Sequence, residues 1–276
     1  MYNPRVVLVS GASSGIGRAC AVRLARAGCR VFGMARTAPS THDGSFLFLR
    51  GDVRKDASVH ECVSRVLREA GRIDVLLNCA GIAVAGPAEE MLTDEIMDQV
   101  QTNLLGTMRM CRAVLPGMRA QQNGRIITIG SLAGLMGWPF QSAYSATKYG
   151  IEGYLESLQM EVEGFGIRVV VVDPGDIATE ITVHRKETRG TGSDSPYRLN
   201  LDSAMQAQAA SERRGWHVER LARLIERIVR SRSPRFRYTP GPFVERISPA
   251  ARRLIPDRLY LKIVARFGGA RARPQG

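Results

Sequence analysis

Short runs of apolar and β-branched residues alternate along the chain with longer segments whose apolar positions recur at helical spacing. The short runs predict strands at residues 5–10, 30–35, 46–49, 73–78, 125–130, 167–173 and 235–239. Helical spacing predicts helices between them, including residues 57–70, 93–120 and 144–163. This order predicts an α/β domain with a doubly wound, mostly parallel sheet of about seven strands, because parallel neighbours need crossover helices.

The alternation weakens after residue 175. Residues 176–215 show little apolar periodicity and are rich in Thr, Ser, Gly and Arg, which predicts a substrate lid or a partly disordered segment. Helical spacing returns at residue 216, with an apolar stripe formed by Leu221, Leu224, Ile225, Ile228 and Val229. We therefore expect a single domain over residues 1–240 and a C-terminal helical extension over residues 241–276.

Composition narrows the class of protein. The chain of 276 residues is 44% hydrophobic and 24% charged, as expected of a globular domain with a large core. No apolar run approaches the ~20 residues that span a bilayer, and the first strand begins too early for a signal peptide. Five cysteines without CxxC spacing predict reduced thiols in a cytoplasmic protein, and the four scattered histidines predict no metal site.

The net charge of +13 is concentrated near the C-terminus. Residues 1–211 carry 22 basic and 21 acidic side chains, whereas residues 212–276 carry 17 and 5. In the extension, an apolar stripe at helical spacing lies beside a basic one: the apolar residues are Leu259, Ile263 and Phe267, and the basic residues are Arg258, Lys262 and Arg266. The pattern is typical of a helix at an anionic membrane surface, and equally of a helix that only caps a pocket. Without interleaved aromatics or a known motif, it does not indicate nucleic-acid binding.

A glycine-rich turn follows the first predicted strand. Gly11, Gly15 and Gly17 open a helix that ends at Gly28. Strand, glycine turn and helix together form a phosphate cradle, because glycine permits close backbone approach and the helix N-terminus attracts anions. This arrangement predicts a Rossmann-type, dinucleotide-binding domain. The residues expected at the cofactor are Gly11, Ser13, Ser14, Gly15, Ile16 and Gly17.

The end of the second predicted strand indicates which dinucleotide binds. A carboxylate at this position usually holds the ribose hydroxyls of NAD, whereas an arginine accommodates the 2′-phosphate of NADP. Here the strand ends at Arg36 and offers no carboxylate, and Ser13 in the glycine turn adds a second phosphate donor. The sequence therefore predicts NADP(H) as cofactor.

Three side chains near the middle of the chain suit hydride chemistry. Ser131 follows a predicted buried strand, and Tyr144 and Lys148 stand four residues apart on one face of the next helix. A free phenol has a pKa near ~10, and a cation held close lowers it toward neutrality. Lys148 can supply that cation, and Ser131 can donate a hydrogen bond to the same substrate oxygen. Lysine is also rare here: there are four, against 35 arginines.

The chain resembles the short-chain dehydrogenase/reductase family over residues 4–240. The resemblance is carried by motifs in family order: Ser10-Gly11-x-x-x-Gly15-x-Gly17, Asp52, Asn78-x-Ala80-Gly81, Asn103, Ser131, Tyr144-x-x-x-Lys148 and Pro174-Gly175. It implies that Tyr144 is the acid/base, that Lys148 lowers its pKa and binds ribose, and that Ser131 holds the substrate oxygen. It also implies that Asn103 places a water of a proton relay.

The same resemblance implies further cofactor contacts. These are Asp52, which would bind the adenine amino group, and Val53, Asn78, Ala80, Gly81, Pro174, Gly175, Ile177 and Thr179, with Thr179 at the carboxamide side of the nicotinamide. Two departures are visible: Ser10 replaces the usual Thr, and Cys79 replaces the usual second Asn. Family members pair through the helices containing Asn103 and Tyr144, which predicts a homodimer or homotetramer.

Residues 130–144 and 152–158 most resemble the 17β-hydroxysteroid and retinol dehydrogenase branch. The resemblance implies an NADP(H)-dependent oxidoreductase for an apolar, steroid-, retinoid- or lipid-like alcohol or ketone. Leu135, Met136, Trp138 and Phe140 would face that substrate, or simply pack in the core. A 3-oxoacyl-type reductase and a non-catalytic, NADP(H)-sensing regulatory protein are the alternatives.

Overall fold

A seven-stranded, wholly parallel sheet forms the centre of the molecule. The computed structural model describes residues 4–37, 44–178, 186–242 and 254–270. The strands are β1 (Val6–Ser10), β2 (Arg30–Ala35), β3 (Leu47–Arg50), β4 (Val75–Asn78), β6 (Gly124–Ile129), β7 (Ile167–Val172) and β11 (Arg237–Tyr238). Their order across the sheet is β11-β7-β6-β4-β1-β2-β3. The predicted α/β fold class is confirmed, and the strand boundaries agree to within about two residues.

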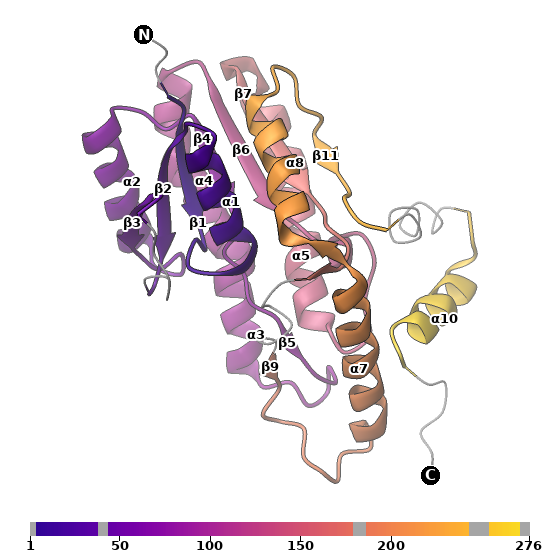
Figure 1. The fold of residues 1–276 in the computed structure, drawn as a ribbon. Helices are drawn as coiled ribbons and strands as arrows, with labels where there is room; N and C mark the ends of the chain where they lie inside the picture. The colour runs from indigo at the N-terminus through magenta and orange to yellow at the C-terminus, as the bar shows by residue number, and fades with distance from the viewer. Residues whose placement is uncertain (1–3, 38–43, 179–185, 243–253, 271–276) are drawn as a thin grey trace.

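Helices cover both faces of this sheet (Figure 1). On one face α1 (Gly15–Arg26) packs with α8 (Val218–Arg230), and Leu24 and Ile225 are fully buried there. On the other face α2 (Asp56–Ala70), α4 (Gly106–Ala120) and α5 (Ser142–Val162) bury Met110 and Leu155. Because both faces are covered, the inner strands β4 and β1 are buried along their whole length and are apolar up to their last residues, Asn78 and Ser10.

The direction of the strand order reverses between β1 and β4. From β1 the chain adds β2 and β3 on one side, then returns to place β4, β6, β7 and β11 on the other. Ligands of open α/β sheets bind in the crevice outside the carboxyl ends of strands at such a switch point. The fold therefore places the glycine turn and the segment after β4 at the edge where a ligand site is expected.

The segment expected as one helix over residues 93–120 has three parts. These are α3 (Thr93–Gln99), a π-helix (Val100–Leu105) and α4. The wider π turn contains Asn103, which is fully buried. Apolar periodicity alone did not reveal this interruption.

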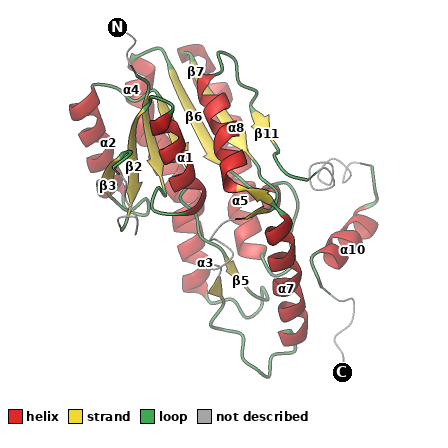
Figure 2. Cartoon of the chain, viewed as in Figure 1, coloured by secondary structure: helices red, strands yellow, loops and turns green. Residues whose placement is uncertain are grey.

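The expected lid, residues 176–215, contains more regular structure than its sequence pattern indicated (Figure 2). It includes β8 (Ile177–Ala178), β9 (Lys186–Glu187) and the helix α7 (Arg198–Arg214), and β10 (Trp216–His217) precedes α8. Strand β9 pairs with β5 (Val84–Ala85), and β10 pairs with β8. Helix α7 went unpredicted because it buries little more than Leu201 and Ala204 among apolar residues.

The C-terminal extension contains α10 (Asp257–Phe267), which lies beside α7. Tyr260 and Val264 are buried and pack on Met136. The predicted apolar stripe is not the buried face: Leu259 is 52% exposed, Ile263 37% and Phe267 70%. Helix α10 instead buries Tyr260 and Val264, the positions that directly follow Leu259 and Ile263, and the membrane contact of the stripe stays a prediction. None of the described helices is both long and apolar enough to traverse a bilayer.

Candidate active site

A cavity of about 1270 Å³ opens at the carboxyl edge of the sheet. Its floor is made by the segments that follow β1, β2, β4, β6 and β7, and α7 and α10 form the far wall. Most of the residues predicted at the cofactor line it: Gly11, Ser13, Ser14, Gly15, Ile16, Gly17, Arg36, Asp52, Val53, Ala80, Gly81, Tyr144, Lys148, Pro174, Gly175 and Ile177. The fold thus brings residues from the whole length of the domain to one edge.

The glycine turn has the tight geometry of a phosphate cradle. Gly11 and Gly15 adopt positive φ angles of 70° and 52°. A Cβ on Gly17 would overlap the carbonyl oxygen of Gly11. Only glycine meets these demands without strain, so the backbone amides and the start of α1 stay open toward the cavity. These features fit a bound dinucleotide.

Ser10, which replaces the usual Thr of the family, joins the end of β1 to the segment after β4 by hydrogen bonds. The hydroxyl oxygen of Ser10 accepts hydrogen bonds from the backbone N–H groups of Cys79, at 3.2 Å, and Ala80, at 3.3 Å. This hydroxyl joins the two strands at the switch point. Cys79 lines the cavity, and burial raises the pKa of its thiol well above the usual value.

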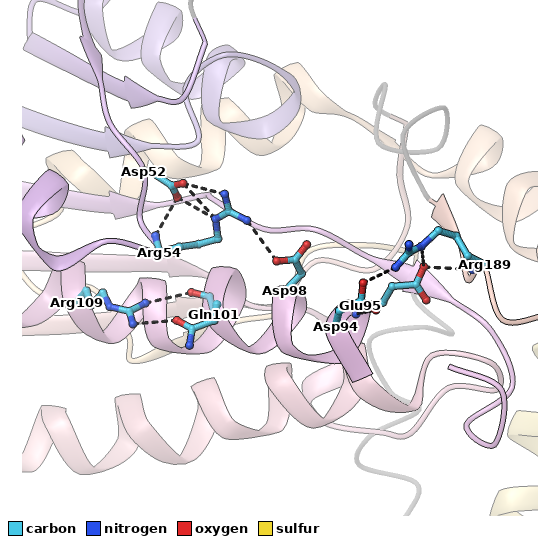
Figure 3. A network of polar contacts seen from close by, with 8 residues as sticks. All are labelled: Asp52, Arg54, Asp94, Glu95, Asp98, Gln101, Arg109 and Arg189. Atoms are coloured by element: carbon cyan, nitrogen blue, oxygen red, sulfur yellow. Dashed lines mark hydrogen bonds and ion pairs between the residues drawn. The ribbon is translucent and has the colours of Figure 1, made fainter. Parts of the chain in front are cut away.

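The carboxylate predicted to bind adenine is engaged by a neighbouring arginine (Figure 3). Arg54 donates from its backbone N–H to Asp52 Oδ1 and from Nη2 to Asp52 Oδ2, both at 3.0 Å, and Nη1 lies 3.3 Å from Asp98. Burial alone would raise the pKa of Asp52, but the hydrogen bonds and charge of Arg54, with the charge of Arg36, hold it below its usual value. Arg54, which sequence reasoning missed, brings a second guanidinium to this end of the cavity.

Ser131, Tyr144 and Lys148 all face the cavity. Ser131 follows β6, where its hydroxyl oxygen accepts a hydrogen bond from Ala133 N at 3.1 Å. Lys148 is 6% exposed and donates from Nζ to the carbonyl oxygen of Ile129 at 2.9 Å. Its Nζ lies 5.7 Å from the centroid of the Tyr144 ring. A phenol, an ammonium and a hydroxyl therefore converge, as proton transfer to or from a substrate oxygen requires.

Asn78 and Asn103 lie behind the cavity wall. Asn78 donates to Thr128 Oγ1 at 3.2 Å. Asn103 Oδ1 accepts from Ile82 N at 2.8 Å, and its Nδ2 donates to Ile82 O at 2.9 Å and to Thr147 Oγ1 at 3.1 Å. Asn103 thereby holds the backbone of Ile82, which lines the cavity, whereas Asn78 bonds to the side chain of the neighbouring strand β6. The water-placing role of Asn103 stays a prediction. Thr179 lies outside the described residues.

The cavity also has an apolar part, although Gln141 and, on α7, Gln208 and Ser211 are polar members of the lining. The apolar lining comes from Met136 and Trp138 after β6, and from α10 through Tyr260, Ile263, Val264 and Phe267. Of the four residues expected to face a substrate, Met136 and Trp138 line the cavity, whereas Leu135 and Phe140 do not. The sequence pattern favours a pocket cap or a membrane contact for this helix, and Ile263 and Phe267 of its predicted apolar stripe do line the cavity.

The segment after β9 is tied to α3 by charged contacts (Figure 3). Arg189 pairs with Asp94 and, at 3.0 Å, with Glu95, and Thr188 Oγ1 donates to Glu95. Burial would raise the pKa of Glu95, but hydrogen bonds from Thr188 and Arg189 lower it. These contacts fix the approach to α7, and with it one wall of the cavity.

The sequence motifs, fold and site define a protein class. The family model for short chain dehydrogenases matches residues 5–190, and the chain belongs to that family. It is therefore an oxidoreductase of the class that interconverts alcohols and ketones with a nicotinamide cofactor.

Individual relatives cover the chain to different extents. The 3-ketodihydrosphingosine reductase of Bacteroides thetaiotaomicron is 38% identical over 256 residues, covering 93% of this chain and 95% of that protein. Human retinol dehydrogenase 8 is 37% identical over 190 residues, 64% of this chain and 60% of that protein. The human 3-oxoacyl-[acyl-carrier-protein] reductase is 39% identical over 189 residues, covering 66% of this chain and 80% of that protein. The structure of a short-chain dehydrogenase from Streptomyces avermitilis superposes with a TM-score of 0.81 at 28% identity, covering 96% of this chain and 98% of that one.

Proposed function

We propose that this protein is an NADP(H)-dependent oxidoreductase for an apolar, lipid-like alcohol or ketone. The observation that carries the proposal is the position of Tyr144, Lys148 and Ser131. They line the same cavity as the phosphate cradle and Arg36, and as the apolar residues of α10. A substrate oxygen held there would have its hydrocarbon part among those apolar residues.

NADP(H) supplies or accepts the hydride. In the reducing direction Tyr144 donates a proton from its hydroxyl to the carbonyl oxygen of the substrate. Ser131 donates a hydrogen bond to the same oxygen, so that the charge developing there is stabilised. Lys148 provides positive charge beside the phenol and would bind the nicotinamide ribose. In the oxidising direction each group reverses its part.

The residues of the cradle fit the proposed cofactor. The backbone of Gly11–Gly17 and the N-terminus of α1 would bind the pyrophosphate, and Arg36 with Ser13 would bind the 2′-phosphate. Gly81, Pro174 and Ile177 would line the nicotinamide end. We assign the segment that contains β9 and α7 as the lid over the substrate.

For the substrate we favour a long-chain ketone. The 3-ketodihydrosphingosine reductase match extends over 93% of this chain, so it includes the α7 wall, whereas the 3-oxoacyl reductase match covers 66%. The test is NADPH oxidation with 3-ketodihydrosphingosine, a 3-ketosteroid, retinal and a 3-oxoacyl thioester. We expect the highest kcat/KM for a long-chain ketone. A preference for the thioester would support the second candidate, and tight NADPH binding without turnover of any ketone would support the regulatory alternative.

We also propose that α10 rests on an anionic membrane surface in the cytoplasm. Arg258, Lys262 and Arg266 are exposed on it, and Leu254 and Leu259 beside them are 87% and 52% exposed. Near an anionic surface each basic residue adds about 1 kcal/mol. All five cysteines are free thiols, in keeping with a reducing compartment.

Liposome co-sedimentation tests the membrane contact. We expect binding that requires anionic lipid, weakens with salt and falls when Arg258, Lys262 and Arg266 are all changed to Gln. The matched control changes three exposed arginines elsewhere, Arg65, Arg68 and Arg119, to Gln, which removes the same charge and should leave binding nearly intact. Equal loss in both triple variants, or no binding at low salt, would contradict a contact through α10.

A further inference from the structure

Two buried carboxyl groups lie directly behind the site, at the carboxyl ends of β6 and β7. Asp173 follows β7 and is fully buried, and Glu152 is one turn beyond Lys148 on α5 and 6% exposed. They meet across Gly130: a Cβ there would overlap Asp173 Oδ1 and lie 3.1 Å from Glu152 Oε1. Only glycine leaves room for both carboxyl groups at this point.

One charged partner holds this pair. Arg237 on β11 donates from Nη2 to Glu152 and, at 3.1 Å, to Glu156, and its Nε lies 3.3 Å from Asp173 Oδ2. Within the described part of the chain, no N–H or hydroxyl group donates a hydrogen bond to the buried oxygens Glu152 Oε1 and Asp173 Oδ2, which leaves a carboxyl proton as their donor. A buried carboxylate oxygen without a donor is costly, and two adjacent carboxylates disfavour double ionisation.

Asp173 also supports the catalytic turn. Its Oδ1 accepts a hydrogen bond from the backbone N–H of Ser131 at 3.2 Å, and Gly130 N donates to Val172 O at 2.8 Å. The Asp173 side chain thereby continues the β6–β7 hydrogen-bond ladder by one step. Lys148 Nζ donates to Ile129 O at 2.9 Å. Residues 129–131 are therefore held by two side chains next to the site, those of Lys148 and Asp173.

We propose that Asp173 and Glu152 share one proton and that Asp173, as a positioning residue, fixes Ser131 through its backbone amide. The inference rests on the proposed function. One shared proton leaves the pair a single negative charge, which Arg237 offsets. The positive charge of Lys148 is then not neutralised by a second carboxylate, and it remains available to the phenol of Tyr144 and to the ribose of the cofactor.

The electrostatic environment agrees with this arrangement. Burial, followed by the charge and hydrogen bond of Glu152, raises the pKa of Asp173 to about 9, against the opposing charges of Arg237 and Lys148. The charged groups that face the pair are Lys148 and Glu156 of α5 and Arg237 of β11. The native state thus retains a proton that the unfolded chain releases above a pKa of about 4. Its stability therefore declines as the pH rises from about 4 to about 9.

The first experiment measures unfolding by denaturant between pH 5 and pH 8. One extra native-state proton changes the unfolding equilibrium constant by up to tenfold per pH unit. We expect Asp173→Asn to lose that part of the pH dependence, because an amide does not titrate. Glu156→Gln is the control: it removes the exposed carboxylate that also pairs with Arg237, and this variant should keep the pH dependence of the native protein. An Asp173→Asn profile parallel to the native one would overturn the shared proton, and this measurement does not depend on enzyme activity.

The second experiment measures kcat and the NADPH dissociation constant. Asn at position 173 can donate to Glu152 and accept from Ser131 N, as the protonated acid does, so kcat should stay within about threefold of native. Asp173→Ala should lower kcat about tenfold or more, with NADPH binding nearly unchanged. Equal kcat losses in both variants, or native kcat in Asp173→Ala, would overturn the positioning role. Inactivity of the native protein on every ketone would instead contradict the proposed function.

Discussion

At the scale of single residues, two arginines line the part of the cavity that we propose for the adenosine of the cofactor. Arg36 directly follows β2, while Arg54 is held by Asp52 and Asp98. The position of Arg36 could be predicted from the sequence because it follows a recognisable strand. The part played by Arg54 could not, since it depends on a contact with α3, a segment more than 40 residues away.

Arg36→Ala should raise the NADPH dissociation constant about tenfold or more. Loss of a charge-assisted hydrogen bond of ~1.5–3 kcal/mol has that effect, whereas NADH lacks the 2′-phosphate and should bind almost as before. Fluorescence titration of both cofactors measures the ratio. Arg54→Ala is the comparison. Because the Arg54 guanidinium is already paired with Asp52 and Asp98, this variant should lose less affinity for NADPH. An unchanged ratio of NADPH to NADH affinity in Arg36→Ala would refute the NADP(H) assignment.

At the scale of elements, the sequence predicted the strands and most helices, because buried parallel strands and amphipathic helices leave clear patterns. It failed where an element depends on distant contacts. The π turn around Asn103 interrupts a helix whose apolar periodicity is continuous, and α7 forms a cavity wall with few buried apolar residues. Helix α10 packs on Met136 through Tyr260 and Val264, which lie outside the apolar stripe seen in the sequence.

The cavity-facing side of α10 predicts a chain-length effect. Phe267 is 70% exposed yet lines the cavity. Phe267→Ala should therefore raise the KM for a long-chain ketone severalfold, because it removes apolar contact area, and should change the KM for a short-chain ketone little. Leu261→Ala, at a position 59% exposed and absent from the lining, is the matched control. Equal effects of Phe267→Ala on long and short ketones would argue against α10 as part of the substrate site.

At the scale of the whole molecule, the family resemblance implies pairing through the helices that carry Asn103 and Tyr144. We propose at least a homodimer formed by α4 and α5. Exposed apolar side chains on or next to those helices support it: Met160 on α5 is 75% exposed, Tyr149 38%, and Met97 on α3 46%. The resemblance indicated these helices from the sequence, whereas the exposure of their individual side chains becomes visible only in the folded chain.

Light scattering at micromolar concentration should give at least twice the monomer mass. Met160→Lys should weaken the assembly, because it places a charge in the proposed interface. Leu47→Lys, at the exposed edge strand β3, adds the same charge elsewhere and should leave the mass unchanged. A monomeric mass for the native protein would contradict the proposed assembly.

The central claim is that Tyr144 transfers the proton in a hydride-transfer reaction, and one measurement tests it most directly. Steady-state kcat of Tyr144→Phe is compared with native protein on the best ketone, with the NADPH dissociation constant measured in parallel. General acid–base groups contribute about 10²–10⁴-fold, so kcat should fall by at least about 100-fold while NADPH binding stays within about twofold. Tyr149→Phe, on the same helix, controls for loss of a phenol outside the site. Near-native kcat in Tyr144→Phe would contradict the account.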